Sequence, residues 1–314
     1  MGAQLRVYRR RIRSVQSTKK ITKAMELIAA SRIAKAQARM KAARPYTDEL
    51  TRALAALGKD TSLTHPMLTG VESPSRTGIL LITSDRGLAG GYNANAIKAA
   101  NELAAQLEAD GREVVRYVIG RKGLAYYRFR HVELAGSWTG FSEQPKFIDA
   151  RAATDAVVAA LTATSANETG GQAGIDELYV VYTKFQNSVT QVPTASLVSP
   201  VHGAPEGAAE PDEAEAKAET EPQPAYEFEP EPDQLIAALL PRYISARIFS
   251  ALLESAASES AARRRAMKSA SDNATELIKT YTRLANQARQ AEITQEISEI
   301  VGGADALASA GTDD

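Results

Sequence analysis

Two long stretches, one at each end of the chain, repeat apolar residues with the spacing of an α-helix. Residues 3–57 contain no glycine, and their first proline is Pro45. One set of apolar positions is spaced by three, four and three residues, and a second set follows in a shifted phase: Leu5, Tyr8, Ile12 and Val15, then Ile21, Met25 and Ile28. This spacing predicts a long helix with a narrow apolar seam, which Pro45 bends or breaks.

The C-terminal stretch, from Asp233 onward, has the same character. Pro241 is predicted to start or kink its main helix, and Gly302 and Gly303 are predicted to end it. Between them the apolar positions alternate steps of four and three: Ala270, Ala274, Leu277, Tyr281, Leu284, Ala288 and Ala291. Roughly sixty helical residues would make a rod on the order of 90 Å long. Because each helix has its seam on one side, we expect the two to pair antiparallel as a coiled coil.

The middle of the chain alternates short apolar runs with helix-like segments. Strands are predicted at 77–83, 114–119, 178–182 and 194–198, and helices near 93–107 and 145–161. This alternation predicts a Rossmann-like α/β domain with a mostly parallel sheet. Two stretches are predicted to lie outside it. One is a polar surface loop at 162–174, and the other is an acidic, proline-rich insertion at 203–232 that cannot bury enough apolar surface to fold alone.

Charge is distributed unevenly, although the net charge of the whole chain is only −1. Residues 1–60 carry 15 lysines and arginines against four acids, a balance of 15 − 4 = +11, whereas residues 203–232 carry ten acids against Lys217. The first segment therefore indicates a polyanionic partner, and a solvated basic helix face is the alternative. The charges expected along one side of the first helix are Arg6, Arg9, Arg13, Lys20 and Lys23.

Composition excludes several classes of protein. The chain has no cysteine, so it has no disulfide, thiolate metal site or cysteine nucleophile. No run of 18 apolar residues occurs, and no apolar stretch follows the basic N-terminus, so we expect neither a membrane span nor a signal peptide. A protein that faces the cytosol is the default expectation.

A glycine-rich segment, SDRGLAGGYN, follows the first predicted strand and precedes a helix, as phosphate-binding loops do. The spacing of Gly87, Gly90 and Gly91 fits neither G-x-G-x-x-G nor G-x-x-x-x-G-K-[ST], and no lysine follows to reach a phosphate. We therefore expect a tight turn in which the glycines allow positive φ and close packing, with no nucleotide or other cofactor bound.

Candidate catalytic groups do not form a convincing site. Ser84, Asp85 and Arg86 are consecutive, and neighbours in sequence rarely converge as a triad. The three histidines lie far apart in predicted loops: His65, His131 and His202. No cluster of Asp, Glu and His has the spacing of metal ligands. The sequence therefore predicts neither an enzyme nor a metal site.

Four motifs, in order along the chain, resemble those of the ATP synthase gamma subunit, the rotor shaft of F-type ATP synthases. They are MGAQLRVYRRRIRSVQSTKKITKAMELIAASRIAKAQ, SDRGLAGGYN, LLESAASESAARRRAMKSASDNA and ARQAEITQEISEIVGGADAL. The motif sequences are most similar to those of actinobacterial members, and the resemblance covers nearly the whole chain except about 203–232. The insertion there and the long loop at 162–174 depart from the family pattern, which leaves the regulation of the protein open.

The resemblance implies an antiparallel coiled coil from residues 1–60 and 233–305, a central α/β domain at 75–200 and a tail at 306–314. It implies a non-catalytic subunit of a proton-translocating ATP synthase, on the cytoplasmic side of the cell membrane. Such a subunit couples proton-driven rotation to conformational change in the catalytic hexamer. The implied partners are the alpha and beta subunits, the epsilon subunit and the membrane c-ring, and no nucleic acid. The C-terminal tip at 293–301 would seat in the bearing of the hexamer.

The resemblance also marks residues expected to contact other subunits. Met25 matches a position near an acidic loop of the beta subunit, and Lys20 and Lys23 belong to the basic face beside it. The other matching positions are Arg263, Arg289, Gln290 and Thr294.

Two other classes of protein stay open. A small α/β nucleotide-binding enzyme would need a phosphate motif and a convergent acid–base pair, which the sequence does not offer. A nucleic-acid-binding coiled coil is suggested by the +11 segment, although the apolar seam of that segment calls for a second helix.

Overall fold

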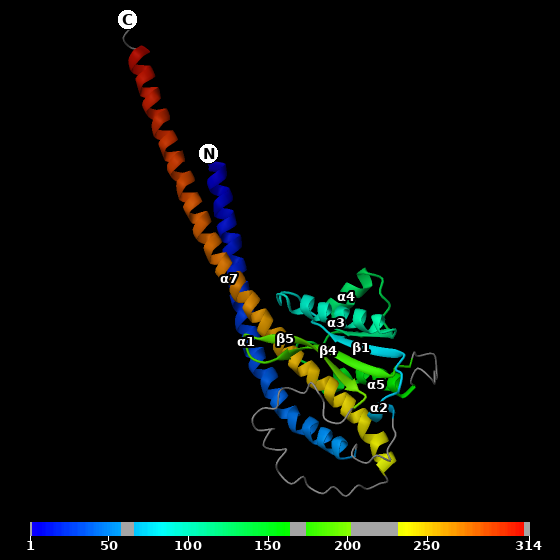
Figure 1. Ribbon diagram of the computed structural model, residues 1–314. Coiled ribbons are helices and arrows are strands. Elements are labelled where there is room, and N and C mark those ends of the chain that lie inside the picture. The colour runs from blue at the N-terminus through cyan, green and yellow to red at the C-terminus, as the bar shows by residue number, and fades with distance from the viewer. Residues whose placement is uncertain (1, 58–65, 164–173, 202–231, 311–314) are drawn as a thin grey trace. The chain divides into compact units, whose positions relative to one another are not determined.

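The computed structural model describes residues 2–57, 66–163, 174–201 and 232–310 (Figure 1). The described residues do not include most of the predicted loop at 162–174, most of the predicted insertion at 203–232, or His65 and His202. The expectations for those stretches therefore stay predictions.

The chain divides into two compact units. Met1–Ile28 and Arg264–Asp314 form one of them, here called the coiled-coil unit, and Ala29–Arg263 form the other, here called the α/β unit. Each unit thus takes part of both long terminal helices, because neither unit boundary coincides with a helix end.

The α/β unit is built on a five-stranded sheet with the strand order β3-β2-β1-β4-β5. The strands are β1 (Arg76–Ile82), β2 (Glu113–Ile119), β3 (Gly136–Trp138), β4 (Glu177–Phe185) and β5 (Gln191–Ser199). Only β5 runs antiparallel to its neighbour, so the prediction of a mostly parallel sheet is confirmed. The sequence predicts four of these strands and misses β3, because three residues are too few to show a period.

Helices cover both faces of the sheet (Figure 1). On one face lie α3 (Tyr92–Ala109) and α4 (Arg121–Phe129). On the other lie α5 (Phe147–Ala163) and the first part of α7 (Pro232–Ala310). Alternate residues of β1 enter the two cores, Ile79 and Leu81 on the α3 side and Leu80 and Ile82 on the α5 side, as the period of a strand requires. The sequence does not reveal α4, because Gly123 and the dense charge of RKGLAYYRF hide its helical pattern.

The two terminal helices continue through the residues predicted to interrupt or end them. α1 spans Gly2–Leu57 and continues through Pro45, and α7 begins at Pro232, so Pro241 lies inside it. Tertiary packing offsets the hydrogen bond that each proline removes. The turns beyond Pro45 bury Leu50, Leu54 and Leu57, and those around Pro241 bury Ile236, Leu240 and Ile244. The prediction that Gly302 and Gly303 end the helix is also wrong, since two glycines cost only about 1 kcal/mol each relative to alanine.

Within the coiled-coil unit the two helices meet along the predicted seam of α1. The rings of Tyr8 and Tyr281 lie 6.4 Å apart, and the guanidinium of Arg11 lies 5.6 Å from the centre of the Tyr281 ring. The shifted phase predicted further along α1 is wrong at two of its three positions: Ile21 and Ile28 are more than half exposed, whereas Met25 is half-buried. The inward positions instead keep the first rhythm, which places Thr22, seven residues after Val15, in the interface at 7% exposure.

The predicted seam of α7 is correct in part. Ala274 is buried and Tyr281 is half-buried, whereas Leu277 is 45% exposed and Ala291 is exposed. Ile278, one residue after Leu277, is half-buried in its place. The remaining predicted positions are half-buried: Ala270, Leu284 and Ala288. Because neighbouring positions of this helix are both apolar, periodicity leaves the seam uncertain by one residue.

α7 also contains a stretch that is long and apolar enough to cross a membrane, within Gln234–Gly302, by length and composition. That stretch is not an unbroken run of 18 apolar residues, so the finding leaves the prediction of no membrane span untested. A helix in the core of a protein passes the same test, and Ile236, Leu240, Ile244, Ile248 and Leu252 of α7 are buried in the core of the α/β unit.

Candidate functional site

The glycine-rich segment forms a loop between β1 and α3, here called the SDRG loop (residues 84–91). Of its glycines, Gly90 has a positive φ, of 57°, and so does Leu88, at 63°. Gly87 and Gly91 do not, and a Cβ on either would make an ordinary contact, 3.5 Å from Lys122 or 3.4 Å from Asn95. The prediction that these glycines allow positive φ is therefore correct for Gly90 alone.

Ser84 fixes the start of the SDRG loop. Its backbone N–H donates to the side-chain oxygen of Asn93 at 2.9 Å, and its hydroxyl donates to the carbonyl oxygen of Arg86 at 2.6 Å. The serine is completely buried. Its hydroxyl therefore closes a turn and is not presented to a substrate.

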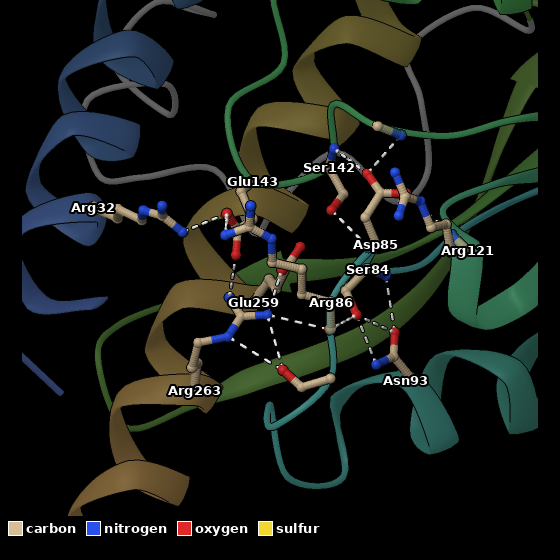
Figure 2. Close-up of polar contacts among 12 residues, drawn as sticks. Arg32, Ser84, Asp85, Arg86, Asn93, Arg121, Ser142, Glu143, Glu259 and Arg263 are labelled. Atoms are coloured by element: carbon tan, nitrogen blue, oxygen red, sulfur yellow. Dashed lines mark hydrogen bonds and ion pairs between the residues drawn. The ribbon is translucent and has the colours of Figure 1, made fainter. Parts of the chain in front are cut away.

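Asp85 joins the SDRG loop to two other elements (Figure 2). One carboxylate oxygen accepts hydrogen bonds from the backbone N–H groups of Gly140 at 2.8 Å and Ser142 at 3.0 Å. The other accepts from the N–H of Arg121 at 3.1 Å, at the first turn of α4. A carboxylate at a helix N-terminus satisfies free N–H groups there and interacts favourably with the helix dipole. Asp85 therefore organises the loop that follows β3.

That loop, between β3 and α5, carries Glu143 into a cluster of charges (Figure 2). The carboxylate of Glu143 pairs with Arg32 of α1, with Arg86 of the SDRG loop at 3.4 Å, and with Arg263 of α7 at 3.2 Å. Its side chain is only 14% exposed. We call Arg32, Arg86, Glu143, Glu259 and Arg263 the charge cluster.

Arg263 is the most buried cation of this cluster, with 5% of its side chain exposed. Its guanidinium pairs with Glu259 at 2.7 Å and donates to the carbonyl oxygens of Arg86 at 3.2 Å and Gly87 at 3.3 Å. The carbonyl of Gly87 is thus a structural acceptor. These contacts tie the SDRG loop to α7.

Burial raises the pKa of Glu259 to about 7, because a carboxylate in the interior loses its hydration. The positive charge of Arg263 and its hydrogen bond oppose that rise, and the negative charge of Glu143 adds to it. The cluster therefore contains a carboxyl group that titrates near neutral pH.

α7 also occupies the place where doubly wound sheets bind ligands. In the order β3-β2-β1-β4 the chain moves outward in both directions from β1, so the crevice lies at the carboxyl ends of β1 and β4. Ser258 of α7 donates its hydroxyl to the carbonyl of Thr183 in β4 at 2.9 Å, and Ser255 and Glu259 are buried beside it. Residues of the chain's own helix thus occupy the crevice in which such sheets bind ligands.

The residues predicted to contact partners belong to both units. Arg263 lies in the α/β unit, where its guanidinium forms ion pairs with Glu259 and Glu143 of the same chain. The others lie in the coiled-coil unit: Lys20, Lys23, Met25, Arg289, Gln290 and Thr294. Lys23 is exposed and pairs with Glu26 at 3.0 Å, Met25 is half-buried, and the hydroxyl of Thr294 donates to the Gln290 carbonyl at 3.0 Å.

Sequence reasoning missed Arg32, Glu143 and Glu259. Glu143 lies in a loop with no motif around it, so the sequence gives no sign of it. Glu259 could have been found, because an acid four residues before an arginine within an apolar, alanine-rich helical stretch predicts a buried ion pair.

Comparisons with known proteins agree on one family. A protein-family model described as ATP synthase matches residues 4–307. An ATP synthase gamma chain from Acidothermus cellulolyticus is 54% identical over 313 residues, covering 100% of both chains. One from Frankia casuarinae is 55% identical over 309 residues, covering 98% of this chain and 99% of the relative.

Solved structures share the fold. A chain of the Euglena gracilis mitochondrial ATP synthase, described as OSCP/F1/c-ring, is 16% identical with a TM-score of 0.65, covering 100% of this chain and 97% of its own. A chain of the Tetrahymena thermophila mitochondrial ATP synthase, described as central stalk/c-ring, is 23% identical with a TM-score of 0.54, covering 80% and 99%. The first similarity covers the whole of this chain, so it includes the long terminal helices as well as the sheet domain.

Proposed function

The chain belongs to the ATP synthase gamma-chain family, and we propose that it couples rotation driven by protons to conformational change in the catalytic subunits. It is a subunit and not an enzyme by itself, as its relatives are gamma chains. The observation that supports the proposal best is the coiled-coil unit. The two ends of one chain pair through Tyr8 and Tyr281, which makes a stiff element suited to transmit torque.

The exposed surface of the coiled-coil unit fits a shaft held inside other subunits. Near the end of α7 four large apolar side chains are 45% to 71% exposed: Ile293, Ile297, Ile300 and Val301. A stripe of this kind on a helix end requires an apolar partner surface. We propose that it seats in the bearing formed by the alpha and beta subunits.

The basic face of α1 supplies a second contact surface. All five of its charges are exposed: Arg6, Arg9, Arg13, Lys20 and Lys23. Long-range attraction to acidic loops of the beta subunits would steer assembly without deep interlocking, so that contacts break and re-form at each step. Met25, Arg289, Gln290 and Thr294 are proposed contacts on the same unit.

Arg263 is proposed to act through the loop that it holds. Its guanidinium is occupied by Glu259, Glu143 and two carbonyls, so a direct contact would require these interactions to open. The exposed neighbours Arg86 and Leu88 are the groups that the SDRG loop presents. We therefore propose the SDRG loop itself as the contact surface there.

The remaining partners and the location follow from the same proposal. We propose that the α/β unit binds the epsilon subunit and the c-ring, and that the complex lies on the cytoplasmic side of the cell membrane. The alternatives, an enzyme and a nucleic-acid-binding coiled coil, have no observation in their favour. The ligand crevice is filled by α7, and the seam of the basic helix is paired with α7.

Purification of the complex from native membranes tests the proposal. The chain should copurify with alpha and beta subunits in a complex that makes ATP when a proton gradient is imposed. Replacing Ile297 and Ile300 by aspartate should lower that synthesis, whereas replacing the exposed Leu277 by aspartate is the matched control. Recovery of the chain free of these subunits, or bound to nucleic acid, would contradict the proposal.

A further inference from the structure

We propose that Glu143 is a positioning residue that fastens both long helices to the SDRG loop where they enter the α/β unit. The inference rests on the proposed function, because its consequence is the transmission of torque. Glu143 lies in none of the four motifs that resemble the gamma family, and its role follows from geometry alone.

Three cations from three separate elements meet at the Glu143 carboxylate. Arg32 comes from α1, Arg86 from the SDRG loop and Arg263 from α7 (Figure 2). Arg32 and Arg86 precede Glu143 by 111 and 57 residues, and Arg263 follows it by 120 residues. A single carboxylate therefore links three segments that are far apart in the sequence.

The cluster lies at a particular place along both helices. The α/β unit takes α1 from Ala29 onward and α7 up to Arg263. Arg32 is three residues inside the first boundary, and Arg263 is the last residue before the second. Glu143 thus holds each helix within one turn of the point where it leaves the α/β unit.

Burial decides which of these contacts matter. The side chains of Arg263, Glu143 and Arg32 are 5%, 14% and 25% exposed, whereas that of Arg86 is 72% exposed. Solvent screens the pair with Arg86, which contributes little. The pairs with Arg32 and Arg263 lie in a poorly hydrated environment, where a lost partner leaves an uncompensated charge. The contact with Arg32 is a charge-assisted hydrogen bond, whereas the contact with Arg263 is an ion pair at 3.2 Å without hydrogen-bond geometry.

The two buried pairs respond differently to the loss of Glu143. Arg263 would keep Glu259 at 2.7 Å and its two carbonyl acceptors. Arg32 would lose its link to α7, because that link passes through Glu143. The loop that presents Glu143 would stay in place, since Asp85 holds the N–H groups of Gly140 and Ser142. The Glu143→Gln change therefore removes the charged link from α1 to α7 and the SDRG loop, while the apolar core shared by the two helices keeps the fold.

A rotor loaded by torque needs that connection. Force applied to the coiled-coil unit acts on both helices at their entry to the α/β unit, and an α1 held there by apolar packing alone would yield more easily. The complex should still hydrolyse ATP in detergent, because the shaft then turns without a load. Activities that require torque against a proton gradient, such as ATP synthesis, should fall.

The experiment uses the assembled complex, carrying Glu143→Gln, in membrane vesicles and in detergent. ATP synthesis driven by an imposed proton gradient should fall by roughly threefold or more, while ATP hydrolysis in detergent and subunit content stay near the parent values. Glu133→Gln, at an exposed position of the same unit, is the matched control. Arg32→Gln should reproduce the defect, and the double variant should be no worse than either single one, because both changes break the same link.

Each outcome has one meaning. An unchanged ratio of synthesis to hydrolysis in Glu143→Gln and Arg32→Gln overturns the inference, and so do additive defects in the double variant. If Glu143→Gln fails to assemble, the more exposed Arg32→Gln decides in the same way. A parent complex that lacks this chain, or makes no ATP, contradicts the proposed function instead.

Discussion

Arg263 lies 2.7 Å from Glu259, one helical turn earlier on α7, and both side chains are almost completely buried. This pair makes the C-terminal helix part of the α/β unit, because the same guanidinium also donates to the SDRG loop. It is the most enclosed charged contact described in the cluster, and the first prediction concerns it.

Replacing Arg263 by methionine should destabilise the α/β unit by about 3–5 kcal/mol, since it leaves Glu259 buried without its partner. Thermal unfolding of the purified complex measures the change. Arg264→Met, at the exposed next residue, should shift the curve little. Equal effects of the two changes would show that burial of Arg263 does not govern its role.

The pH dependence of stability should reveal Glu259. Its pKa is raised to about 7 in the folded chain, so between about pH 4.5 and 7 the folded state keeps a proton that the unfolded state releases. Stability from this group is present at low pH and falls as the pH rises, by a total on the order of 3 kcal/mol. The stability of the parent relative to Glu259→Gln should therefore decrease from pH 5 to pH 8. A difference that stays constant or grows over this range would contradict the raised pKa.

Gly120 should matter more than the glycines of the SDRG loop. It has a φ of 101°, and a Cβ there would lie 2.2 Å from the carbonyl oxygen of Thr83. Gly111 has a φ of 81° with nothing within 4 Å of a Cβ, so Gly111→Ala is a control for backbone strain alone. We expect Gly111→Ala to cost about 1–2 kcal/mol and Gly120→Ala clearly more, measured by thermal unfolding. Similar costs would show that the close approach to Thr83 relaxes freely.

The basic face of α1 should act through electrostatic attraction. Changing Lys20 and Lys23 to glutamate should leave helix content unchanged, because exposed charges contribute about 0–1 kcal/mol each. Binding to the alpha and beta subunits, or coupled ATP turnover, should weaken, and the defect should ease toward about 1 M salt, where the Debye length is about 3 Å.

Lys279 offers a matched control for that change. It is exposed and pairs with Glu276 at 2.8 Å, as Lys23 pairs with Glu26 at 3.0 Å, but it lies on α7. Lys279→Glu should have a smaller effect. If the double change on α1 leaves assembly and turnover unaltered at low salt, that face is only a solvated surface.

The acidic segment at 203–232 should be dispensable for assembly, because its composition offers few apolar anchors. Its deletion, with a short flexible linker in its place, should leave the alpha and beta subunits in the purified complex. A complex that no longer copurifies would make the segment an assembly element. Changed rates of ATP synthesis or hydrolysis in an intact complex would instead assign it to regulation.

The sequence predicts those parts of the fold that repeat over many residues. Four strands and the two terminal helices show their periods clearly. β3 is too short to show one, and the seam of α7 moves by one residue at Leu277 because the apolar Ile278 adjoins it. Pro45 and Pro241 look like breaks, yet packing that local sequence does not reveal carries the helices through them. α7 also continues through the exposed Gly302, because a glycine costs a helix only about 1 kcal/mol relative to alanine.

The site was less predictable than the fold, for a different reason. The SDRG loop is visible as a motif, and its role as a turn is correct at Gly90. The charge cluster is assembled from residues up to 231 positions apart, from Arg32 to Arg263, and no spacing rule connects them. Glu143 in particular is an ordinary loop acid until the sheet, α1 and α7 bring three arginines to it.

Because α7 fills the crevice, the sheet holds a helix of its own chain where a doubly wound sheet binds a ligand. In a ligand-binding relative of the fold, occupancy would depend on concentration, and the occupant would leave. Here the occupant is covalently attached, so its local concentration is permanently high and it does not exchange. The contacts of Ser258 and Arg263 thus fix the position and orientation of α7 on the sheet permanently. Interactions that would select a ligand in a binding site here align a helix that transmits torque.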